Sequence, residues 1–328
     1  MQVIYVEKAI ENHPRAKRII GRFAGRAKVI SCEHYREVFN PKSQNFRLQK
    51  QQPALILAQK TGARVLPTPE GFGIGGEQNY YFSHMLNCLY DCRYCFLQGM
   101  YQSANYVLFV NYEDFMQEIA ELSCSNPGAY FFSGYDADSL AYEPVSGFLQ
   151  EFLPFFAEHR KVYLELRTKS ANINALLQHE SLENVIAAFS FTPHEISQQV
   201  EHKVPPVTKR IGSLNKLADR GWRVGLRFDP LIYASNFDSI YAKLIDDIFA
   251  NLDAKAIHSV SVGPLRFPNK MYRKLVALYP EDKLLAHPLV ARKKNVTYPE
   301  KVEDQMKHFV LSYLQKYLDK TLVFECQA

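Results

Sequence analysis

Short runs of β-forming residues alternate with segments of helical periodicity from about residue 80 to residue 262. Runs rich in aromatic and β-branched residues lie at 80–83, 129–133, 162–167, 185–192, 224–229 and 259–262. Between them, apolar residues recur with helical spacing at 112–122, 145–157, 207–220 and 237–250. Strands that alternate with helices in this way are typical of a parallel sheet with helical crossovers.

Six such units predict one of two α/β arrangements, an open doubly wound sheet or an incomplete barrel. In both arrangements, functional residues gather at the carboxyl ends of the parallel strands. These ends read SHMLNC, SGYDAD, RTKS, FTPHE, FDP and VGPLRF, and they are rich in small, polar and charged residues. We therefore expect the functional site at this edge of the sheet.

Two extensions flank the repeated part of the chain. The first is a basic N-terminal subdomain at 1–76, with a predicted helix at 16–24 and a glycine-rich flexible loop at 71–76. The second covers 266–328 and contains predicted helices at 269–278 and 302–318. Between these helices, Lys293, Lys294 and Asn295 are expected at the tip of a β-hairpin. The predicted barrel or open sheet occupies 77–265.

The composition is that of a globular protein, with 47% hydrophobic residues and a net charge of +5. No stretch approaches the roughly 18 apolar residues of a membrane helix, and the N-terminus lacks the apolar core of a signal peptide, so a cytoplasmic protein is expected. Residues 1–70 hold 13 Lys and Arg against 5 Asp and Glu, a net charge of +8. This segment either faces water or contacts phosphates. In the second case its aromatic residues would stack on bases: Phe23, His34, Tyr35, Phe39 and Phe46.

Three of the six cysteines lie within eight residues, in the pattern CxxxCxxC directly after the first strand of the repeat. Cys88, Cys92 and Cys95 are spaced to converge on an iron–sulfur cluster, and three ligands leave one iron of a four-iron cluster open for chemistry. The alternative is a zinc site with His84 as the fourth ligand. The remaining cysteines, Cys32, Cys124 and Cys326, are expected to be inert buried thiols.

The CxxxCxxC motif, with an aromatic residue before its third cysteine and a series of βα units after it, resembles the radical S-adenosylmethionine superfamily. NCLYDCRYCFLQG, FFSGYDADS, LRTKS, FSFTPHE and KRIGSLNKLADRGWRVGLRFDP together resemble the spore photoproduct lyase family over nearly the whole chain. The resemblance implies a partial (β/α)6 barrel of the TIM type with N- and C-terminal extensions. It also implies a 4Fe-4S cluster, S-adenosylmethionine, a DNA substrate and an electron donor such as flavodoxin or ferredoxin.

The resemblance also assigns roles to residues of this chain. Cys88, Cys92 and Cys95 would bind the cluster. Lys169 matches a lysine that contacts the cofactor, and its charge suits the carboxylate of S-adenosylmethionine. The cofactor-binding residues implied in this way are Tyr94, Ser133, Gly134, Lys169, Ser190 and Asp229.

The chain departs from the family pattern at two positions. Tyr135 stands where the family has its hydrogen-donor cysteine, and Phe96 stands where the family has a tyrosine of its radical relay. We therefore predict a changed substrate, held under Tyr135, Asp136 and Asp138. A damaged or modified DNA is the leading candidate. The alternatives are RNA, a nucleotide or a metabolite, or a metal-stabilised nucleic-acid-binding protein without catalysis.

Two other cysteines could replace the missing donor. Cys124 lies at the end of a predicted helix, at the opposite end of the unit from the site. Cys326 lies in the C-terminal tail, and no pattern in the sequence places that tail near the cluster. Neither is therefore predicted to act as the donor.

Overall fold

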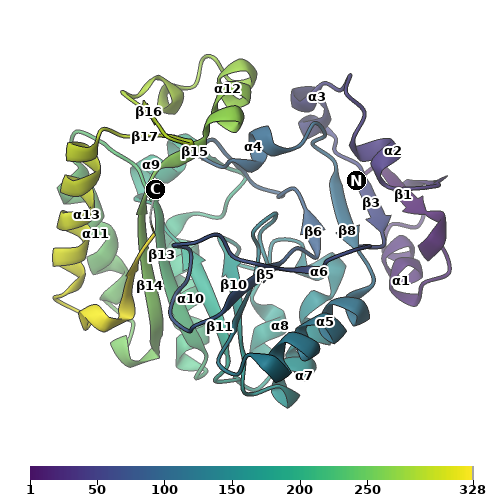
Figure 1. Cartoon of the computed structure of the whole chain (residues 1–328), viewed down its shortest axis with the longest axis horizontal. Coiled ribbons are helices and arrows are strands. Elements are labelled where there is room, and N and C mark those ends of the chain that lie inside the picture. Colours follow the sequence, from purple (N-terminus) through teal and green to yellow (C-terminus); the bar gives the residue numbers. More distant parts are fainter. Residues whose placement is uncertain (327–328) are drawn as a thin grey trace.

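The computed structural model describes residues 1–326, and its centre is a curled eight-stranded sheet (Figure 1). Seven strands run parallel, and β4 joins the edge of the sheet antiparallel to β5. In spatial order the strands are β18 (Val323–Glu325), β14 (Ile257–Pro264), β13 (Arg223–Leu231), β11 (Val185–Ser190), β10 (Tyr163–Thr168), β9 (Tyr130–Ser133), β5 (Asn79–Phe82) and β4 (Val65–Pro67). All six predicted strands are present, and the predicted partial barrel is confirmed.

The two faces of this sheet bury different sets of side chains, because successive residues of a strand point to opposite faces. Phe131, Leu164 and Phe189 belong to the large core that also contains the helices' apolar residues. Their neighbours Tyr130 and Ile186 belong to a separate, smaller cluster. The smaller cluster is the inside of the half-barrel.

Helices follow the strands and cover the outer face. They are α5 (Tyr112–Ser125), α6 (Glu143–Ser146), α7 (Phe148–Glu158), α8 (Asn174–Leu177), α9 (His194–Val200), α10 (Val207–Asp219) and α11 (Phe237–Phe249). The single helix predicted at 145–157 is two helices, because Gly147 between them has a left-handed φ of 61°. A residue in that conformation ends a helix.

A second, five-stranded sheet lies beside the half-barrel, on the right in Figure 1. Its strands are β2 (Lys28–Cys32), β1 (Val3–Glu7), β3 (Leu55–Ala58), β8 (Tyr106–Phe109) and β6 (Met85–Leu86), in that order. The helices of this part are α1 (Pro14–Arg22), α2 (Arg36–Phe39) and α3 (Phe46–Gln51). Since β6 and β8 follow residue 76, this sheet takes strands from both sides of the proposed boundary, and the division of the chain at 76 and 265 stays a proposal.

Three of the five aromatic residues that would stack on bases lie in the interior, whereas Phe23 and His34 are half-buried. Tyr35, Phe39 and Phe46 are buried, and Tyr35 and Phe39 belong to the large core. Arg15 is also buried and pairs with Glu113. These side chains stabilise the fold because apolar rings gain more from burial than from exposure to water. No helix within residues 1–326 is long and apolar enough to cross a membrane.

The C-terminal part adds one small sheet and two long helices. Helix α12 (Asn269–Leu278) precedes the predicted hairpin, in which β16 (Val290–Arg292) and β17 (Asn295–Thr297) pair antiparallel around Lys293 and Lys294. Strand β15 (Arg266–Pro268) completes this sheet. Helix α13 (Glu300–Leu314) then leads to β18, the yellow strand beside β14 in Figure 1.

An ion pair crosses the inside of the half-barrel. Glu165 of β10 and Arg227 of β13 are both fully buried, and their nearest charged atoms lie 2.7 Å apart. Arg227 also donates to the carbonyl and the hydroxyl of Ser259 on β14, each at 2.9 Å. The pair therefore ties three strands together at the middle of the barrel.

Glu165→Gln is expected to destabilise the protein strongly, because it leaves the Arg227 guanidinium buried without its counter-charge. The loss in the free energy of unfolding should be about 3–5 kcal/mol. Urea denaturation measures it. The control is Lys243→Gln, which breaks the exposed Lys243–Asp247 pair on α11 and should leave the midpoint unchanged. Equal midpoints for Glu165→Gln and the wild type would contradict this account.

Candidate active site at the barrel mouth

The three-cysteine loop is held against the barrel by a short β-ribbon. It lies between β6 and helix α4 (Leu97–Met100), and its middle forms β7 (Asp91–Cys92). Strand β7 pairs antiparallel with β12 (Glu201–His202), so that Cys92 lies opposite Glu201. The next amide, that of Arg93, donates to the carbonyl of Val200 at 2.8 Å. Because β12 directly follows α9, the ribbon fixes the loop to the segment after the fourth parallel strand of the repeat.

Ion pairs fix the other side of the loop. The carboxylate of Asp91 lies 2.7 Å from Lys50 of α3 and 2.7 Å from Arg93. Arg93 also pairs with Asp282 at 3.2 Å. Although burial raises the pKa of Asp91, these cations hold it below its usual value. Asp91 therefore links the loop to the N-terminal part, and Arg93 links it to the C-terminal part.

The three thiols belong to one short loop, in which Cys92 is buried and Cys88 and Cys95 are half-buried. Burial raises the pKa of Cys88 to about 12, and it also raises the pKa values of Cys92 and Cys95. Each thiol is near enough to the others that charge on one raises the pKa of the next. The ammonium of Lys169 acts on all three in the opposite direction. A cation among three thiols favours their anionic, metal-binding forms.

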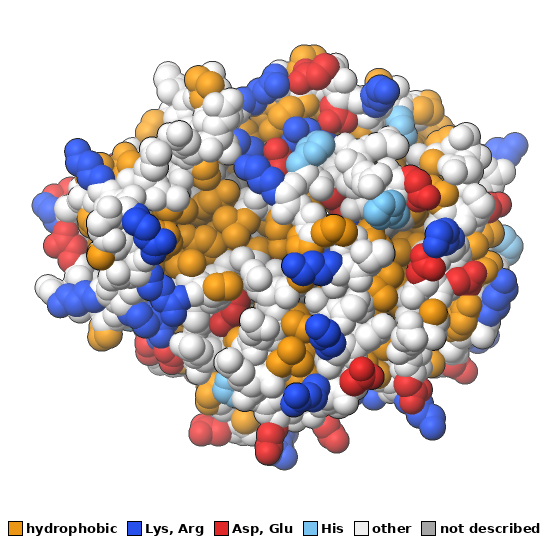
Figure 2. Space-filling view, turned by 180° about the vertical axis from the view of Figure 1, so that it is seen from behind, with side chains coloured by type: hydrophobic (Ala, Val, Ile, Leu, Met, Phe, Trp, Pro, Cys, Tyr) orange, Lys and Arg blue, Asp and Glu red, His pale blue; other side chains and the backbone are white. Residues whose placement is uncertain are grey.

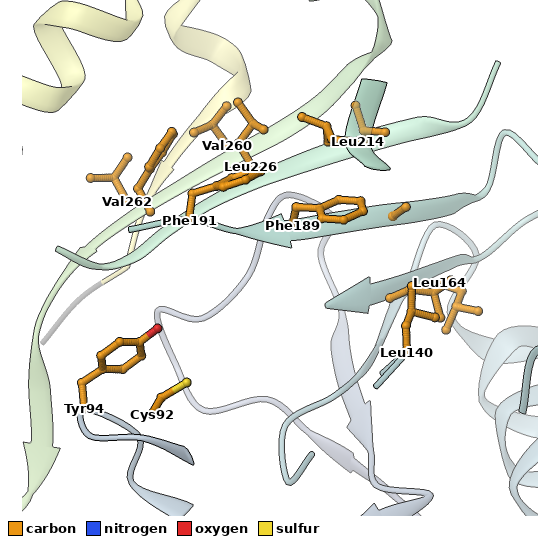
Figure 3. Close-up of a cluster of buried hydrophobic side chains, with 14 of the residues drawn as sticks. Cys92, Tyr94, Leu140, Leu164, Phe189, Phe191, Leu214, Leu226, Val260 and Val262 are labelled. Carbon is orange, nitrogen blue, oxygen red and sulfur yellow. The ribbon is translucent and has the colours of Figure 1, made fainter. Parts of the chain in front are cut away.

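Lys169 and Tyr94 form the inner wall of this site. The Lys169 ammonium lies 5.2 Å from the centre of the Tyr94 ring, and the Tyr94 hydroxyl donates to Glu201. Glu201 is fully paired, with Arg210 at 2.6 Å and the Ser197 hydroxyl at 2.6 Å. Figure 3 shows Cys92 and Tyr94 close together at the edge of the apolar core, apart from the side chains of the strands. The predicted residues Tyr94 and Lys169 thus meet at the cysteines.

The donor set fits an iron–sulfur cluster, because three thiolates bind three irons of a four-iron cluster and leave the fourth iron open. In addition, the buried Thr192 hydroxyl beyond the end of β11 has no hydrogen-bond partner. Such a group is suited to bind a cofactor.

The alternative zinc site with His84 is not supported. His84 is fully buried, and its ring stacks on Phe148 at 4.1 Å between centroids and 9° between planes. Its Nδ1 atom has no hydrogen-bond partner. The imidazole is therefore part of the apolar core, and burial lowers its pKa to about 3.

Asp138 organises the strand tails at the mouth. Its carboxylate accepts from the Thr168 hydroxyl and the Lys169 amide, both at 2.6 Å, and from the amides of Leu140 and Ala141 at 3.0 and 2.9 Å. These contacts use both oxygens and join the tails of β9 and β10. A catalytic role for Asp138 stays a prediction, and its contacts support the positioning of Lys169.

Ser133, Gly134 and Ser190 lie at the strand ends, as predicted, but two of them have evident structural roles. The Ser133 hydroxyl is buried and bonds to Ser139 at 2.8 Å and to the Glu165 carbonyl at 3.1 Å. Gly134 has a φ of 94°, and a side chain there would lie 3.0 Å from the Arg167 carbonyl. Ser190 is buried at the end of β11. Their roles in cofactor binding stay predictions.

Asp229 and Tyr135 lie on the side of the mouth nearest β18. Asp229 forms a two-point ion pair with Arg266, at 2.8 and 3.1 Å, which holds its pKa below the usual value although burial raises it. The Tyr135 ring stacks on Tyr81 with centroids 4.6 Å apart. Burial raises the pKa of Tyr135 to about 12, while nearby Arg167 lowers it.

Asp136 lies apart from Asp138, although the two are separated by one residue. Its carboxylate accepts from the Ser83 hydroxyl at 2.6 Å. Burial raises its pKa, while Ser83, Tyr101 and Lys60 lower it. Asp136 also raises the pKa of Tyr81, the ring that stacks on Tyr135, and the catalytic roles of Tyr135, Asp136 and Asp138 stay predictions.

Several residues at the mouth were missed by sequence reasoning. Glu201 and Lys50 hold the cysteine loop, and Arg167 and Arg266 surround Asp229. Alternation along β10 could have indicated Arg167, because it lies two residues after Glu165 and two before Lys169. Of the cysteines expected to be inert and buried, Cys124 is instead exposed on α5, and Cys326 lies at the mouth beside Asp229.

A half-barrel of parallel strands with a three-cysteine loop at its mouth defines the radical S-adenosylmethionine class of proteins. A family model described as spore photoproduct lyase matches residues 76–324. The chain belongs to the spore photoproduct lyase family. The matched region of the chain contains the cysteine loop and the parallel strands from β5 to β14.

Known proteins of this kind share the fold of the chain. Spore photoproduct lyase of Bacillus subtilis (strain 168) is 22% identical over 202 residues, which is 60% of this chain and 59% of that protein. The match thus spans about three fifths of the curated relative. A spore photoproduct lyase complexed with dinucleoside spore photoproduct has a TM-score of 0.84 at 15% identity, covering 99% of this chain and 98% of that chain. A double mutant with bound S-adenosylmethionine and dinucleoside spore photoproduct has the same TM-score, identity and coverage.

The burial of His84 predicts a specific dependence of stability on pH. Its pKa is lowered to about 3 in the folded state, whereas the unfolded chain protonates it near 6.5. Its contribution to stability is therefore present above pH 6.5 and is lost as the pH falls below it, by about 1.4 kcal/mol per pH unit.

His84→Phe keeps a stacked ring. Between pH 6.5 and about pH 5, its unfolding free energy should fall less steeply than that of the wild type, by up to about 1.4 kcal/mol per pH unit. The control is His179→Gln at an exposed site, which should leave the slope unchanged. Denaturant titrations at several pH values measure this. An identical slope in His84→Phe and the wild type would show that His84 is protonated in the folded state.

Proposed function

We propose that the chain is a radical S-adenosylmethionine enzyme that acts on damaged or modified DNA. The observation that carries the proposal is the buried arrangement of Cys88, Cys92 and Cys95 around Lys169 at the barrel mouth. Membership of the spore photoproduct lyase family supports the class of reaction. When bound, the cluster and S-adenosylmethionine supply a 5'-deoxyadenosyl radical, and the protein positions the reacting groups.

The residues of the chain have distinct tasks in this proposal. Cys88, Cys92 and Cys95 hold the cluster. Lys169, whose charge acts on all three thiols, binds the carboxylate of S-adenosylmethionine by charge and hydrogen bonding. Asp138 holds the Lys169 backbone, and Glu201 holds Tyr94. These contacts keep the cofactor site rigid during reduction.

A nucleic-acid substrate is supported by the structural relatives. Two of them contain dinucleoside spore photoproduct, a lesion of DNA, in chains that share this fold over 99% of its length. The space-filling view from behind Figure 1 shows an apolar hollow with Lys and Arg side chains at its rim (Figure 2). Such a surface suits bases inside the hollow and phosphates at its rim. Tyr135 and Phe96, where the family carries a cysteine and a tyrosine, favour a lesion other than spore photoproduct or a different route of hydrogen transfer.

The first test is the formation of 5'-deoxyadenosine. After anaerobic reconstitution with iron and sulfide and reduction with dithionite, the wild type should convert S-adenosylmethionine to 5'-deoxyadenosine, detected by mass spectrometry. Cys92→Ala should lose both the cluster absorbance and the product. Cys124→Ala, which removes an exposed thiol far from the loop, is the matched control and should behave as the wild type. Reconstituted wild type that carries a cluster and forms no 5'-deoxyadenosine would exclude the proposed function.

A second test addresses Lys169. Lys169→Met should weaken S-adenosylmethionine binding by roughly 1.5–3 kcal/mol, or about 10- to 150-fold in Kd, because a charge-assisted contact is lost. Equilibrium dialysis with the reconstituted protein measures the Kd, and iron content verifies that the cluster remains. Lys243→Met on the exposed face of α11 serves as the control. Unchanged affinity in Lys169→Met would remove Lys169 from the cofactor site.

A further inference from the structure

The C-terminal strand brings a thiol into the barrel mouth. Strand β18 pairs in parallel with β14, with Phe324 opposite Ser261. The next ladder bond runs from the Cys326 amide to the Val262 carbonyl at 2.8 Å. Since parallel strands end at the same edge of a sheet, Cys326 lies at the carboxyl edge, where the other strand tails form the site.

Cys326 points to the inside of the half-barrel. Phe324, two residues earlier on β18, packs against the interior cluster that contains Tyr130 and Phe132. Residues two apart on a strand share a face, so the Cys326 side chain points inward as well. It is 6% exposed.

The neighbours of Cys326 belong to the candidate site. A Cβ atom on Gly263 would lie 2.9 Å from Cys326 Cβ and 3.0 Å from Asp229 Oδ1, so the absence of a side chain at Gly263 lets these two residues approach. The Cys326 thiol also helps to lower the pKa of Asp229. Arg167, Arg266 and Tyr135 complete the group, and Tyr135 packs against the same interior cluster as Phe324.

An independent feature shows that this part of the interior is built for more than packing. The Ser261 hydroxyl, one layer below Gly263 on β14, is fully buried and has no hydrogen-bond partner. An unpaired buried hydroxyl costs free energy unless a ligand or water satisfies it. Ser261 lies opposite Phe324, two residues before Cys326, so the unpaired hydroxyl is on the neighbouring strand, one layer below the thiol.

We propose that Cys326 is the hydrogen-atom donor of this enzyme and that Tyr135 is its partner at the barrel mouth. The inference rests on the proposed function. The S–H bond of Cys326 breaks and a C–H bond forms on the substrate radical, which leaves a thiyl radical on Cys326. The thiyl radical then takes the hydrogen atom of the Tyr135 hydroxyl. The tyrosyl radical then takes a hydrogen atom from the methyl group of 5'-deoxyadenosine, whose C–H bond breaks to give back the 5'-deoxyadenosyl radical, so that no external reductant is consumed.

Isotope transfer from solvent tests this assignment. Thiol and phenol hydrogens exchange with deuterium oxide, whereas carbon-bound hydrogens do not. The reconstituted wild type, Cys326→Ser and Cys124→Ser are each incubated in deuterium oxide with S-adenosylmethionine and dinucleoside spore photoproduct. The wild type and Cys124→Ser should form product that carries deuterium. Cys326→Ser should lose the deuterated product, because a serine O–H bond is too strong to donate its hydrogen atom.

The outcomes separate this inference from the proposed function. Deuterated product in Cys326→Ser equal to that of the wild type would overturn the role of Cys326 and leave the proposed function intact. Absence of 5'-deoxyadenosine in the wild type would overturn both. Where the wild type forms 5'-deoxyadenosine without converting the dinucleoside, the deuterium content of 5'-deoxyadenosine decides: a fall in Cys326→Ser supports the assignment, and an unchanged content overturns it.

A second measurement does not depend on turnover. Bound dinucleoside should slow the alkylation of Cys326 by iodoacetamide in the cluster-containing protein, because the substrate covers the mouth. Peptide mass mapping compares Cys326 with exposed Cys124 in the same sample, and only Cys326 should be protected. Equal alkylation rates at Cys326 with and without a bound dinucleoside, with binding verified by dialysis, would contradict its position at the substrate.

Discussion

Charged side chains inside the half-barrel have to be paired, and this constraint orders the whole interior. Strand alternation directs Glu165 and Arg167 of β10 to the same face, and Lys169 follows directly after the end of the strand. Glu165 at the lowest level pairs with Arg227 and with Arg167. Arg167 also lies near Asp229 and Tyr135. Among the described contacts, Lys169 forms no ion pair with a carboxylate. The unpaired charge of Lys169 at the mouth thus depends on the Glu165–Arg227 ion pair deeper in the barrel.

The cysteine loop is positioned by contacts that come from all parts of the chain. Lys50 of α3 reaches Asp91, the β12 segment after α9 pairs with β7, and Asp282 reaches Arg93. A loop that binds a cluster cannot rely on regular secondary structure, since its backbone must turn to present each thiol. Ion pairs and a two-residue ribbon replace the missing helix or strand contacts. This explains why the N- and C-terminal extensions are part of the site's support although they carry none of the three cysteines.

Most of the fold could be predicted from the sequence because its signals are local. Each barrel strand is a short β-rich run, and the CxxxCxxC spacing is contained within eight residues. The split of one predicted helix at Gly147 and the burial of Phe39 were not predicted, since tertiary packing decides both. Cys326 could not be placed either. Its position depends on the pairing of β18 with β14, two strands about 60 residues apart in sequence that are joined through α12, a hairpin and α13.

The parallel edge of the sheet allows different strands to supply side chains to the same site. Every strand that joins the sheet in parallel delivers its last residue to the same mouth. A tail strand such as β18 therefore contributes a side chain to the site without disturbing the strands already there. Tyr135 follows β9, and Cys326 follows β18 and lies beside Asp229. The chemistry at the mouth therefore depends on the set of side chains that the strand ends deliver, whichever strand carries each of them.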